Sequence, residues 1–291
     1  MSHTPQALEL AHAAQVGALI EAVTSGWGEA CLSEYAFANL WLFRREHRYR
    51  FTDGDWPLIS GHTYDGTHHA MPLFALDQTP VAVIDDLLDR HDCLYPVPAE
   101  TALRLDPDRY ALSANRDDAD YLYPADHFRH YRGRLLNKKR NLMKQLLRDH
   151  RVEAEPYSPA WEADALDVLA GWMSDKGKLA GSADERPCRD VLANAQALGL
   201  WGFGYRVDGS AGGFVLAERL APGVHAVRFA KSRDTFKGLA QYMFHHLATH
   251  GPADLAWLNF EQDLGLPNFR QTKLSYQPTG LLDKWRVQRR S

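Results

Sequence analysis

The second half of the chain alternates apolar and polar positions in short runs that end at turn residues, a pattern typical of strands. Strands are expected over residues 200–207, 213–218 and 224–229, and the first two runs stop at Asp-Gly and Pro-Gly turns. Residues 235–250 repeat apolar side chains at helical spacing, and residues 255–260 form an apolar strand of the buried type. The predicted order is therefore β-β-β-α-β.

The first half predicts a similar order. Strands are expected over residues 49–52, 56–62 and 68–75, a helix follows Thr79-Pro80, and a strand over residues 93–97 comes after it. Two halves with matching order indicate a tandem duplication, with domains at residues 1–126 and 127–291. A length of 291 residues allows both halves a core of their own. One continuous α+β domain is the alternative.

The composition narrows the class of protein. With 45% hydrophobic and 24% charged residues the chain is an ordinary globular protein, which excludes disorder and a coiled coil as whole-chain descriptions. No apolar run approaches the roughly 18 residues of a transmembrane helix, and the N-terminus lacks the features of a secretory signal. Three widely spaced cysteines do not predict a disulfide framework. We therefore expect a cytoplasmic protein.

Charge is sorted along the chain. The net charge is only −4, yet residues 81–126 carry eleven acidic and four basic side chains, and residues 127–151 carry nine basic and one acidic. Local asymmetry indicates binding partners better than the total does. The small net charge therefore does not exclude a polyanionic partner.

The basic segment predicts an amphipathic helix over residues 135–148. Its expected apolar stripe consists of Leu135, Leu136, Leu142, Met143, Leu146 and Leu147. Arg140, Lys144 and Arg148 follow at intervals of four and form a basic ridge, which Lys138 and Lys139 flank. Such a ridge suits the phosphates of a nucleic acid, a coenzyme or a lipid headgroup. A solvated helix face without a partner is the alternative.

Three hairpin-linked strands, a helix and a parallel return strand form the core of the GNAT acyltransferase fold. The predicted fold class is thus α+β, with tandem GNAT-like domains that each hold a mixed, mostly antiparallel sheet flanked by helices. In that fold the N-terminus of the helix binds the pyrophosphate of an acyl donor. Here the junction carries Lys231, Arg233, Lys237 and Gly238, which predicts a donor phosphate site. A capped surface helix with a packing glycine remains the alternative.

Four stretches carry a family resemblance. They are SEYAFANLW at residues 33–41, YRGRLLNKKRNLMKQLL at 131–147, the junction at 231–238, and NFEQDLGLPNFRQTKLSY at 259–276. The sequence resembles, over residues 31–285, the soluble bacterial family related to the C-terminal domain of phosphatidylglycerol lysyltransferases. The resemblance implies a tandem GNAT-like fold and transfer of an acyl or aminoacyl group to an amine or hydroxyl. In the lysyltransferases the donor is aminoacyl-tRNA and the acceptor a lipid headgroup.

The segment after the last predicted strand supplies the catalytic candidates. Alternation places Asn259, Glu261 and Asp263 on one side of an extended chain. A carboxylate there would take the proton from an attacking amine, and Asn259 would orient the acceptor or stabilise an oxyanion. A capping cluster, with Glu261 paired to Arg270 or Lys273, fits these residues equally well. Further substrate contacts are predicted for Lys273, Tyr276 and Glu218.

Other chemistries find less support. His246 and His250 have a zinc-compatible spacing, but there is no HExxH and no nearby acid, so no metal is expected.

Three functions stay open. The first is aminoacyl transfer from aminoacyl-tRNA, with its acceptor end as partner and phosphates held by Lys138, Lys139, Arg140 and Lys144. The second is acyl transfer from coenzyme A. The third is a non-catalytic RNA- or protein-binding module. The acceptor would be a small molecule, a lipid headgroup or a peptide, and no tightly bound cofactor is expected.

Overall fold

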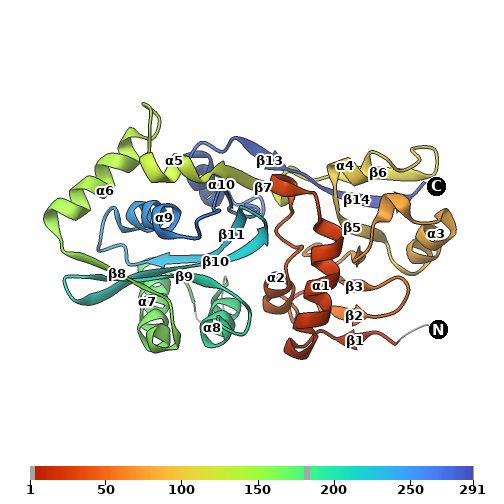
Figure 1. Ribbon diagram of the computed structural model, residues 1–291, viewed down its shortest axis with the longest axis horizontal. Coiled ribbons are helices and arrows are strands. Elements are labelled where there is room, and N and C mark those ends of the chain that lie inside the picture. The colour runs from red at the N-terminus through yellow and green to blue at the C-terminus, as the bar shows by residue number, and fades with distance from the viewer. Residues whose placement is uncertain (1–3, 180–183, 291) are drawn as a thin grey trace. The chain divides into compact units, whose positions relative to one another are not determined.

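A computed structural model describes residues 4–179 and 184–290 (Figure 1). The chain divides into two compact units. The first unit comprises Met1–Tyr121, Gln262–Pro267 and Leu281–Ser291, and the second comprises Leu122–Glu261 and Asn268–Gly280. The sequence predicts a single boundary between residues 126 and 127, whereas in the structure two later segments return to the first unit.

The first sheet has seven strands in the order β1-β2-β3-β4-β5-β14-β6. They are β1 (Gln6–Ala7), β2 (Arg50–Thr52), β3 (Leu58–His62), β4 (His68–Pro72), β5 (Cys93–Pro98), β6 (Tyr110–Ala114) and β14 (Lys284–Arg289). The helices of this unit are α1 (Ala13–Thr24), α2 (Phe37–Leu42), α3 (Val81–Arg90) and α4 (Ala99–Ala102).

The second sheet also has seven strands, in the order β13-β7-β12-β11-β10-β9-β8. They are β7 (Asp120–Pro124), β8 (Val152–Pro156), β9 (Trp201–Val207), β10 (Ser210–Ala221), β11 (Val224–Ser232), β12 (Trp257–Asn259) and β13 (Gly280–Leu282). The helices are α5 (Ala125–His130), α6 (Asn137–Asp149), α7 (Glu162–Asp175), α8 (Glu185–Asn194), α9 (Leu239–His250) and α10 (Pro267–Leu274). Helix α9 lies on one face of the sheet, and α7 and α8 lie on the other (Figure 1).

The predicted fold class is confirmed. Both units contain three antiparallel strands, a helix and a parallel return strand, as β2-β3-β4-α3-β5 and as β9-β10-β11-α9-β12. The return strands β5 and β12 pair in parallel with β4 and β11, while the other described strand pairs are antiparallel. Each sheet is therefore mixed and mostly antiparallel, and the protein is α+β.

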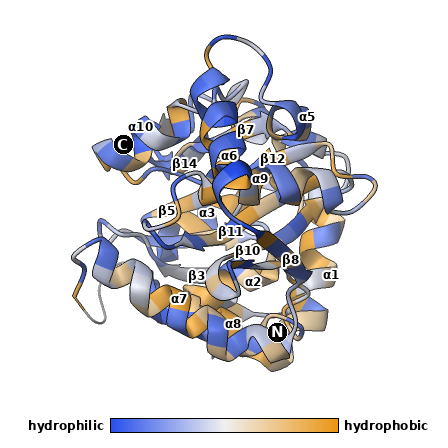
Figure 2. Cartoon of the chain, turned by 90° about the vertical axis from the view of Figure 1, so that its left-hand side faces the viewer, coloured by the Kyte–Doolittle hydropathy of each residue, from blue (hydrophilic) through white to orange (hydrophobic). Residues whose placement is uncertain are grey.

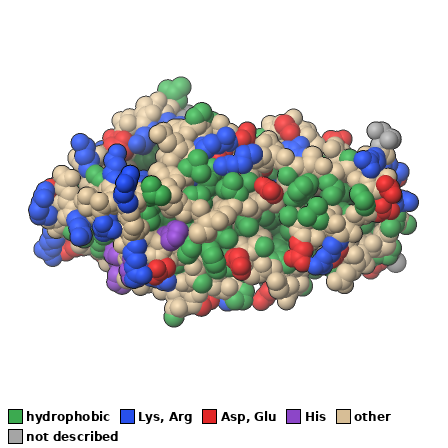
Figure 3. Space-filling view, turned by 90° about the horizontal axis from the view of Figure 1, so that it is seen from above, with side chains coloured by type: hydrophobic (Ala, Val, Ile, Leu, Met, Phe, Trp, Pro, Cys, Tyr) green, Lys and Arg blue, Asp and Glu red, His purple; other side chains and the backbone are tan. Residues whose placement is uncertain are grey.

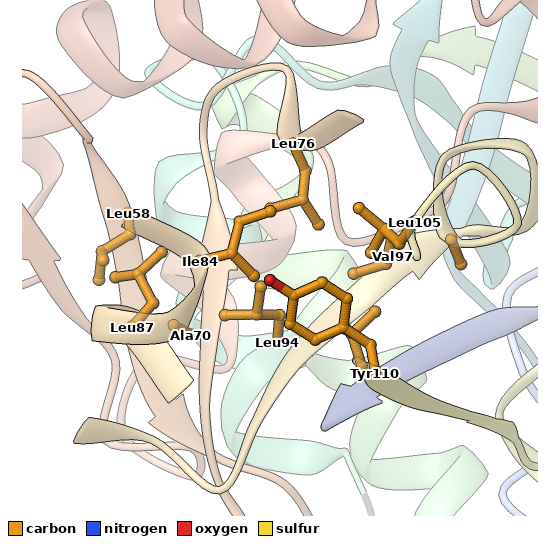
Figure 4. Packing of buried hydrophobic residues seen from close by; sticks show 11 residues of the cluster. Leu58, Ala70, Leu76, Ile84, Leu87, Leu94, Val97, Leu105 and Tyr110 are labelled. Atoms are coloured by element: carbon orange, nitrogen blue, oxygen red, sulfur yellow. The ribbon is translucent and has the colours of Figure 1, made fainter. Parts of the chain in front are cut away.

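The C-terminal strand belongs to the core of the first unit, which explains the discontinuous division of the chain. Strand β14 lies between β5 and β6 and is antiparallel to both. Its Val287 is fully buried in the cluster that Leu94, Ile84 and Leu87 help to form (Figure 4). Without β14 the facing edges of β5 and β6 would lose their backbone hydrogen-bond partners.

The basic helix is confirmed as α6, but its apolar stripe is narrower than predicted. Leu136 and Leu146 are buried, whereas Leu135 is 71% exposed and Leu147 is 47% exposed. The helix begins at Asn137, so Leu135 precedes it, and Leu146 is the buried residue within α6, which packs against α9. Most of α6 is hydrophilic (Figure 2). In the described part of the chain no helix has the length and apolarity to cross a membrane.

Acid should destabilise the first unit through His69. This ring is 2% exposed, and burial is the main reason why its pKa falls from 6.5 to about 3. The unfolded chain binds this proton below about pH 6.5 and the folded chain does not, so stability falls as pH drops towards 3. Between pH 7 and pH 5 the loss is about 2 kcal/mol. Urea unfolding of His69→Phe should show a pH dependence smaller by that amount, and an unchanged dependence would contradict this assignment.

Candidate active site

In the second unit the parallel strands β11 and β12 part after a short pairing. Residues Val224–Ala226 pair with Trp257–Asn259, and β11 then continues to Ser232 while β12 ends. The point where β11 and β12 part is called the splay, and several polar side chains gather there. This point lies at the carboxyl end of β12 and beside the continuing part of β11, and ligands commonly bind at the carboxyl ends of parallel strands.

A β-bulge on β11 places an arginine at the splay. Phe229 faces Leu216 on β10 and Val227 faces the next residue, Ala217, so Arg228 is the extra residue between these two pairs. Such a bulge re-aims the extra side chain. The side chain of Arg228 is only 1% exposed.

Arg228 bridges two carboxylates. Its Nε donates to Oε2 of Glu218 at 2.7 Å, and its Nη1 donates to Oε1 of Glu261 at 2.5 Å. Burial disfavours the charged guanidinium, but the two carboxylates outweigh burial and raise the pKa of Arg228 above its usual value. The side chain of Glu218 is 9% exposed and that of Glu261 is 21% exposed. Glu261 is thus the member of the trio that is most accessible to a substrate.

The turn after β12 fixes the backbone of Glu261. The amide of Glu261 donates to Oδ1 of Asn259 at 2.7 Å, and Glu261 has a left-handed φ of 56°. Lys273 on α10 donates from Nζ to the carbonyls of Phe260 and Glu261, at 2.6 and 3.1 Å. The Lys273 ammonium therefore provides hydrogen-bond partners for both carbonyls at this turn of the chain. Asn259 and Lys273 therefore shape the turn that presents Glu261.

The structure brings four of the predicted residues together, namely Glu218, Asn259, Glu261 and Lys273. Asp263 belongs to the first unit. It is fully buried there and accepts hydrogen bonds from the Tyr121 hydroxyl at 2.5 Å, from the Gly265 amide at 2.9 Å and from Arg116 at 3.3 Å. Helix α10 begins four residues later, at Pro267, so these bonds do not test the predicted capping of a helix by Asp263. Glu261 is paired with Arg228, a partner that the sequence pattern does not predict.

The junction before α9 carries cations that already have acidic partners. Lys231 is buried, and its Nζ lies 2.8 Å from both carboxylate oxygens of Asp184 and 3.8 Å from the ring centre of Trp172. Arg233 donates from Nε to Asp175 at 3.1 Å. Lys237 is exposed. Two of the three predicted phosphate ligands are therefore neutralised by carboxylates of the same unit.

Gly238 is a packing glycine. It has φ 97° and precedes α9, and a Cβ built on it would lie 2.2 Å from the carbonyl oxygen of Leu142 on α6. The close approach that glycine permits is thus filled by the backbone of α6.

Gly238→Ala should therefore cost more stability than a positive φ alone explains. Gly209 is the matched control, because its φ is 84° and nothing lies within 4 Å of the position that a Cβ would take there. The backbone strain common to both variants is about 1–3 kcal/mol, and Gly238→Ala adds the clash with α6. Thermal unfolding should give a clearly lower Tm for Gly238→Ala than for Gly209→Ala. Equal Tm values would mean that α6 moves away at little cost.

Helix α6 presents cations without carboxylate partners. Lys138 and Lys144 are exposed, and within residues 4–179 and 184–290 neither they nor Lys139 forms an ion pair with an acid. Lys139 is half-buried, with Nζ 3.9 Å from the ring centre of Tyr276, and burial lowers its pKa. Arg140 instead donates to the Tyr131 carbonyl at 2.7 Å and to Asn137. Lys and Arg side chains gather where α6 lies, on the left in Figure 3.

The remaining candidates do not enlarge the site. Tyr276 is buried, its hydroxyl accepts a hydrogen bond from Gln241 at 3.1 Å, and burial raises its pKa. The rings of His246 and His250 stack with centres 4.2 Å apart, and no group of three potential metal ligands is arranged for a metal among the described residues. A cavity of about 550 Å³ in this unit is lined by residues of 157–162 and 192–200 and includes none of the splay residues.

The sequence of this chain matches a known protein family. The family described as "Phosphatidylglycerol lysyltransferase, C-terminal" matches residues 29–288. A conserved protein of unknown function from Bacteroides thetaiotaomicron VPI-5482 has a similar structure, with TM-score 0.84, 23% identity, and coverage of 99% of this chain and 100% of that one. No curated protein matches the sequence.

Two further structures share the fold at lower identity. L-PGS from Bacillus licheniformis gives TM-score 0.56 and 15% identity, covering 86% of this chain and 91% of the other. FemX gives TM-score 0.58 and 8% identity, covering 98% and 96%. At these identities the likeness establishes the tandem GNAT-like fold and leaves substrates open.

Proposed function

Because the chain belongs to the family of the phosphatidylglycerol lysyltransferase C-terminal domain, we propose that it transfers an aminoacyl group from aminoacyl-tRNA to an acceptor. The acceptor amine or hydroxyl attacks the ester carbonyl directly. A new C–N or C–O bond forms, the ester C–O bond breaks, and the tRNA ribose oxygen leaves with a proton. Small molecules, lipid headgroups and peptides all carry a suitable acceptor group.

The distribution of paired and unpaired cations carries this proposal. A polyanion gains most from cations that have no acidic partner, because each contact then releases counterions without breaking an ion pair. Lys138 and Lys144 on α6 are exposed and have no carboxylate partner in the described residues, whereas Lys231 and Arg233 are each bound to an aspartate. This difference favours a nucleic acid at α6 over a coenzyme pyrophosphate at the junction before α9.

The space at Gly238 also favours aminoacyl-tRNA over coenzyme A. A pyrophosphate at the start of α9 needs room beside the backbone of the junction. That room is occupied by Leu142 of α6. Acyl transfer from coenzyme A is therefore the weaker candidate.

Glu261 is the proposed general base. Its carboxylate lies at the splay and remains partly exposed. It would take the proton from the attacking amine or hydroxyl. The geometry supports Asn259 and Lys273 as residues that hold the turn, and Glu218 as a partner of Arg228, in place of the substrate contacts predicted from the sequence.

Binding of tRNA should depend on the exposed lysines of α6. In filter-binding assays with total bacterial tRNA charged with amino acids, Lys138→Ala/Lys144→Ala should weaken binding. The slope of log affinity against log salt should fall by about 1 per lost phosphate contact. The matched control is Lys176→Ala/Lys237→Ala, which removes the same charge beside the junction, where Lys176 pairs with Asp234 at 2.7 Å. Equal weakening by both pairs, or wild-type binding by the α6 pair, would refute the proposed binding surface.

A further inference from the structure

A buried arginine between two carboxylates is unusual in a protein interior, because taking three charges out of water costs several kcal/mol per ion before pairing. Arg228, Glu218 and Glu261 together carry a formal charge of −1. Hydrophobic residues at these positions would pack without that cost. The trio also lies at the splay, and the regular hydrogen-bond ladder of β11 is interrupted at Arg228. Both facts indicate a role beyond stability.

Two nitrogen atoms of the Arg228 guanidinium have different partners. Nε and Nη1 are fixed in one plane, and each binds a different carboxylate, Glu218 through Nε and Glu261 through Nη1. Glu218 is the more deeply buried acid and is held on β10, inside the sheet. It therefore anchors the guanidinium, and the guanidinium in turn fixes the direction of the more exposed Glu261 carboxylate. A lysine has no such planar fork.

We propose that Arg228 is the positioning residue of the active site: Glu218 anchors its guanidinium, and the guanidinium orients the Glu261 carboxylate for proton transfer. This inference rests on the proposed function, since it assigns Arg228 a part in the chemistry of Glu261. Arg228 on β11 contacts this carboxylate, and Lys273 on α10 contacts the backbone carbonyl of the same residue. Lys273 thereby holds the turn, and Arg228 holds the side chain.

The first test follows the Glu261 carboxyl by NMR in protein labelled with ¹³C-glutamate, its signal identified by its absence in Glu261→Gln. At pH 7 the chemical shift of this signal should change in Arg228→Gln, because the guanidinium that binds the carboxylate is lost. It should also change in Glu218→Gln, because the guanidinium then loses its contact with β10 and turns. Arg219→Gln, which breaks the exposed Arg219–Asp254 pair on the same strand as Glu218, should leave the chemical shift unchanged.

The variant Glu218→Gln keeps the test decisive, because it leaves the contact between Arg228 and Glu261 in place and removes only the anchor. An unchanged chemical shift in Arg228→Gln or Glu218→Gln would overturn the inference. If Arg228→Gln does not fold, Glu218→Gln and Arg228→Lys carry the test. Arg228→Lys keeps the charge but not both contacts, so its chemical shift should also differ from that of wild type. A chemical shift equal to that of wild type would overturn the requirement for arginine.

The second test separates positioning from substrate binding. In single-turnover transfer from labelled aminoacyl-tRNA, Glu218→Gln should lower the rate at saturating tRNA roughly tenfold or more while the Kd for tRNA stays unchanged. A changed Kd with an unchanged rate would contradict a positioning role. The NMR measurement needs no transfer activity, so the predicted changes in chemical shift without any transfer would refute the proposed function, and transfer with unchanged chemical shifts would refute only the role of Arg228.

Discussion

Glu261→Gln should lower the rate of aminoacyl transfer by roughly 10²–10⁴-fold, the usual contribution of a general base. Glutamine retains the size of the side chain and can still contact Arg228, but it cannot accept a proton. The rate of label release from aminoacyl-tRNA to acceptor, measured in single turnover, reports this loss. Binding of tRNA should stay at the wild-type level, because α6 provides the proposed phosphate contacts.

A matched control distinguishes a lost base from a general loss of negative charge. Glu153→Gln removes an acid of the same unit that is 42% exposed and paired with Arg151, and it should leave transfer unchanged. If Glu261→Gln transfers at the wild-type rate, Glu261 is not the base. If neither protein transfers but both bind tRNA, the alternative of a non-catalytic binding module gains its support.

Lys284→Met should destabilise the first unit by about 3–5 kcal/mol, the usual cost of leaving buried charges without their partner. Nζ of Lys284 is fully buried, 2.7 Å from Oδ1 of Asp120 and 2.5 Å from Oε1 of Glu34. Burial disfavours the ammonium, yet the two acids raise the pKa of Lys284 above its usual value. Methionine would leave the two carboxylates facing each other. Urea denaturation at pH 7 measures the change in the free energy of unfolding.

Arg289→Met is the control for this effect. Arg289 lies on the same strand, and its pair with Asp89 is exposed on both sides. Water and salt screen such a pair, so its loss should change stability little. A similar loss in both variants would mean that the hydrogen bonds of β14, and not the buried charges, hold the C-terminal strand in place.

The order of strands and helices can be predicted from the sequence because both units repeat simple periods. Runs such as residues 201–207 and 224–232 are bounded by turn residues, and the helix after each third strand has a clear apolar face. The period of residues 135–148 predicts a helix, but the predicted stripe includes Leu135 and Leu147, which are exposed. Periodicity locates a face without indicating how much of it a neighbouring helix covers.

The site can be predicted only in part, because its main contacts join distant segments. Glu261 pairs with Arg228, 33 residues earlier in the chain, and Arg228 reaches it from a bulge. Regular alternation gives no sign of the bulge. An arginine within the strand 224–229, whose other residues are apolar except His225, is the available signal.

The charged residues of the junction before α9 also have partners that lie far away in the sequence. Lys231 and Arg233 indicate an anion site when their neighbours in sequence are considered alone. In the structure their partners are Asp184 and Asp175, 47 and 58 residues away. Local charge therefore identifies an unpaired cation only where no distant acid folds back onto it, as for Lys138 and Lys144 among the described residues.

The central claim, transfer from aminoacyl-tRNA, is tested most directly by following the label. Total bacterial tRNA charged with ¹⁴C-labelled amino acids is incubated with the protein and with small-molecule, lipid and peptide fractions of a bacterial extract. Label should leave the tRNA and appear in one fraction as a stable amide or ester, and Glu261→Gln should abolish this product. Label that stays on the tRNA or appears only as free amino acid, with acetyl-coenzyme A and the same fractions giving an acylated product instead, would contradict the claim.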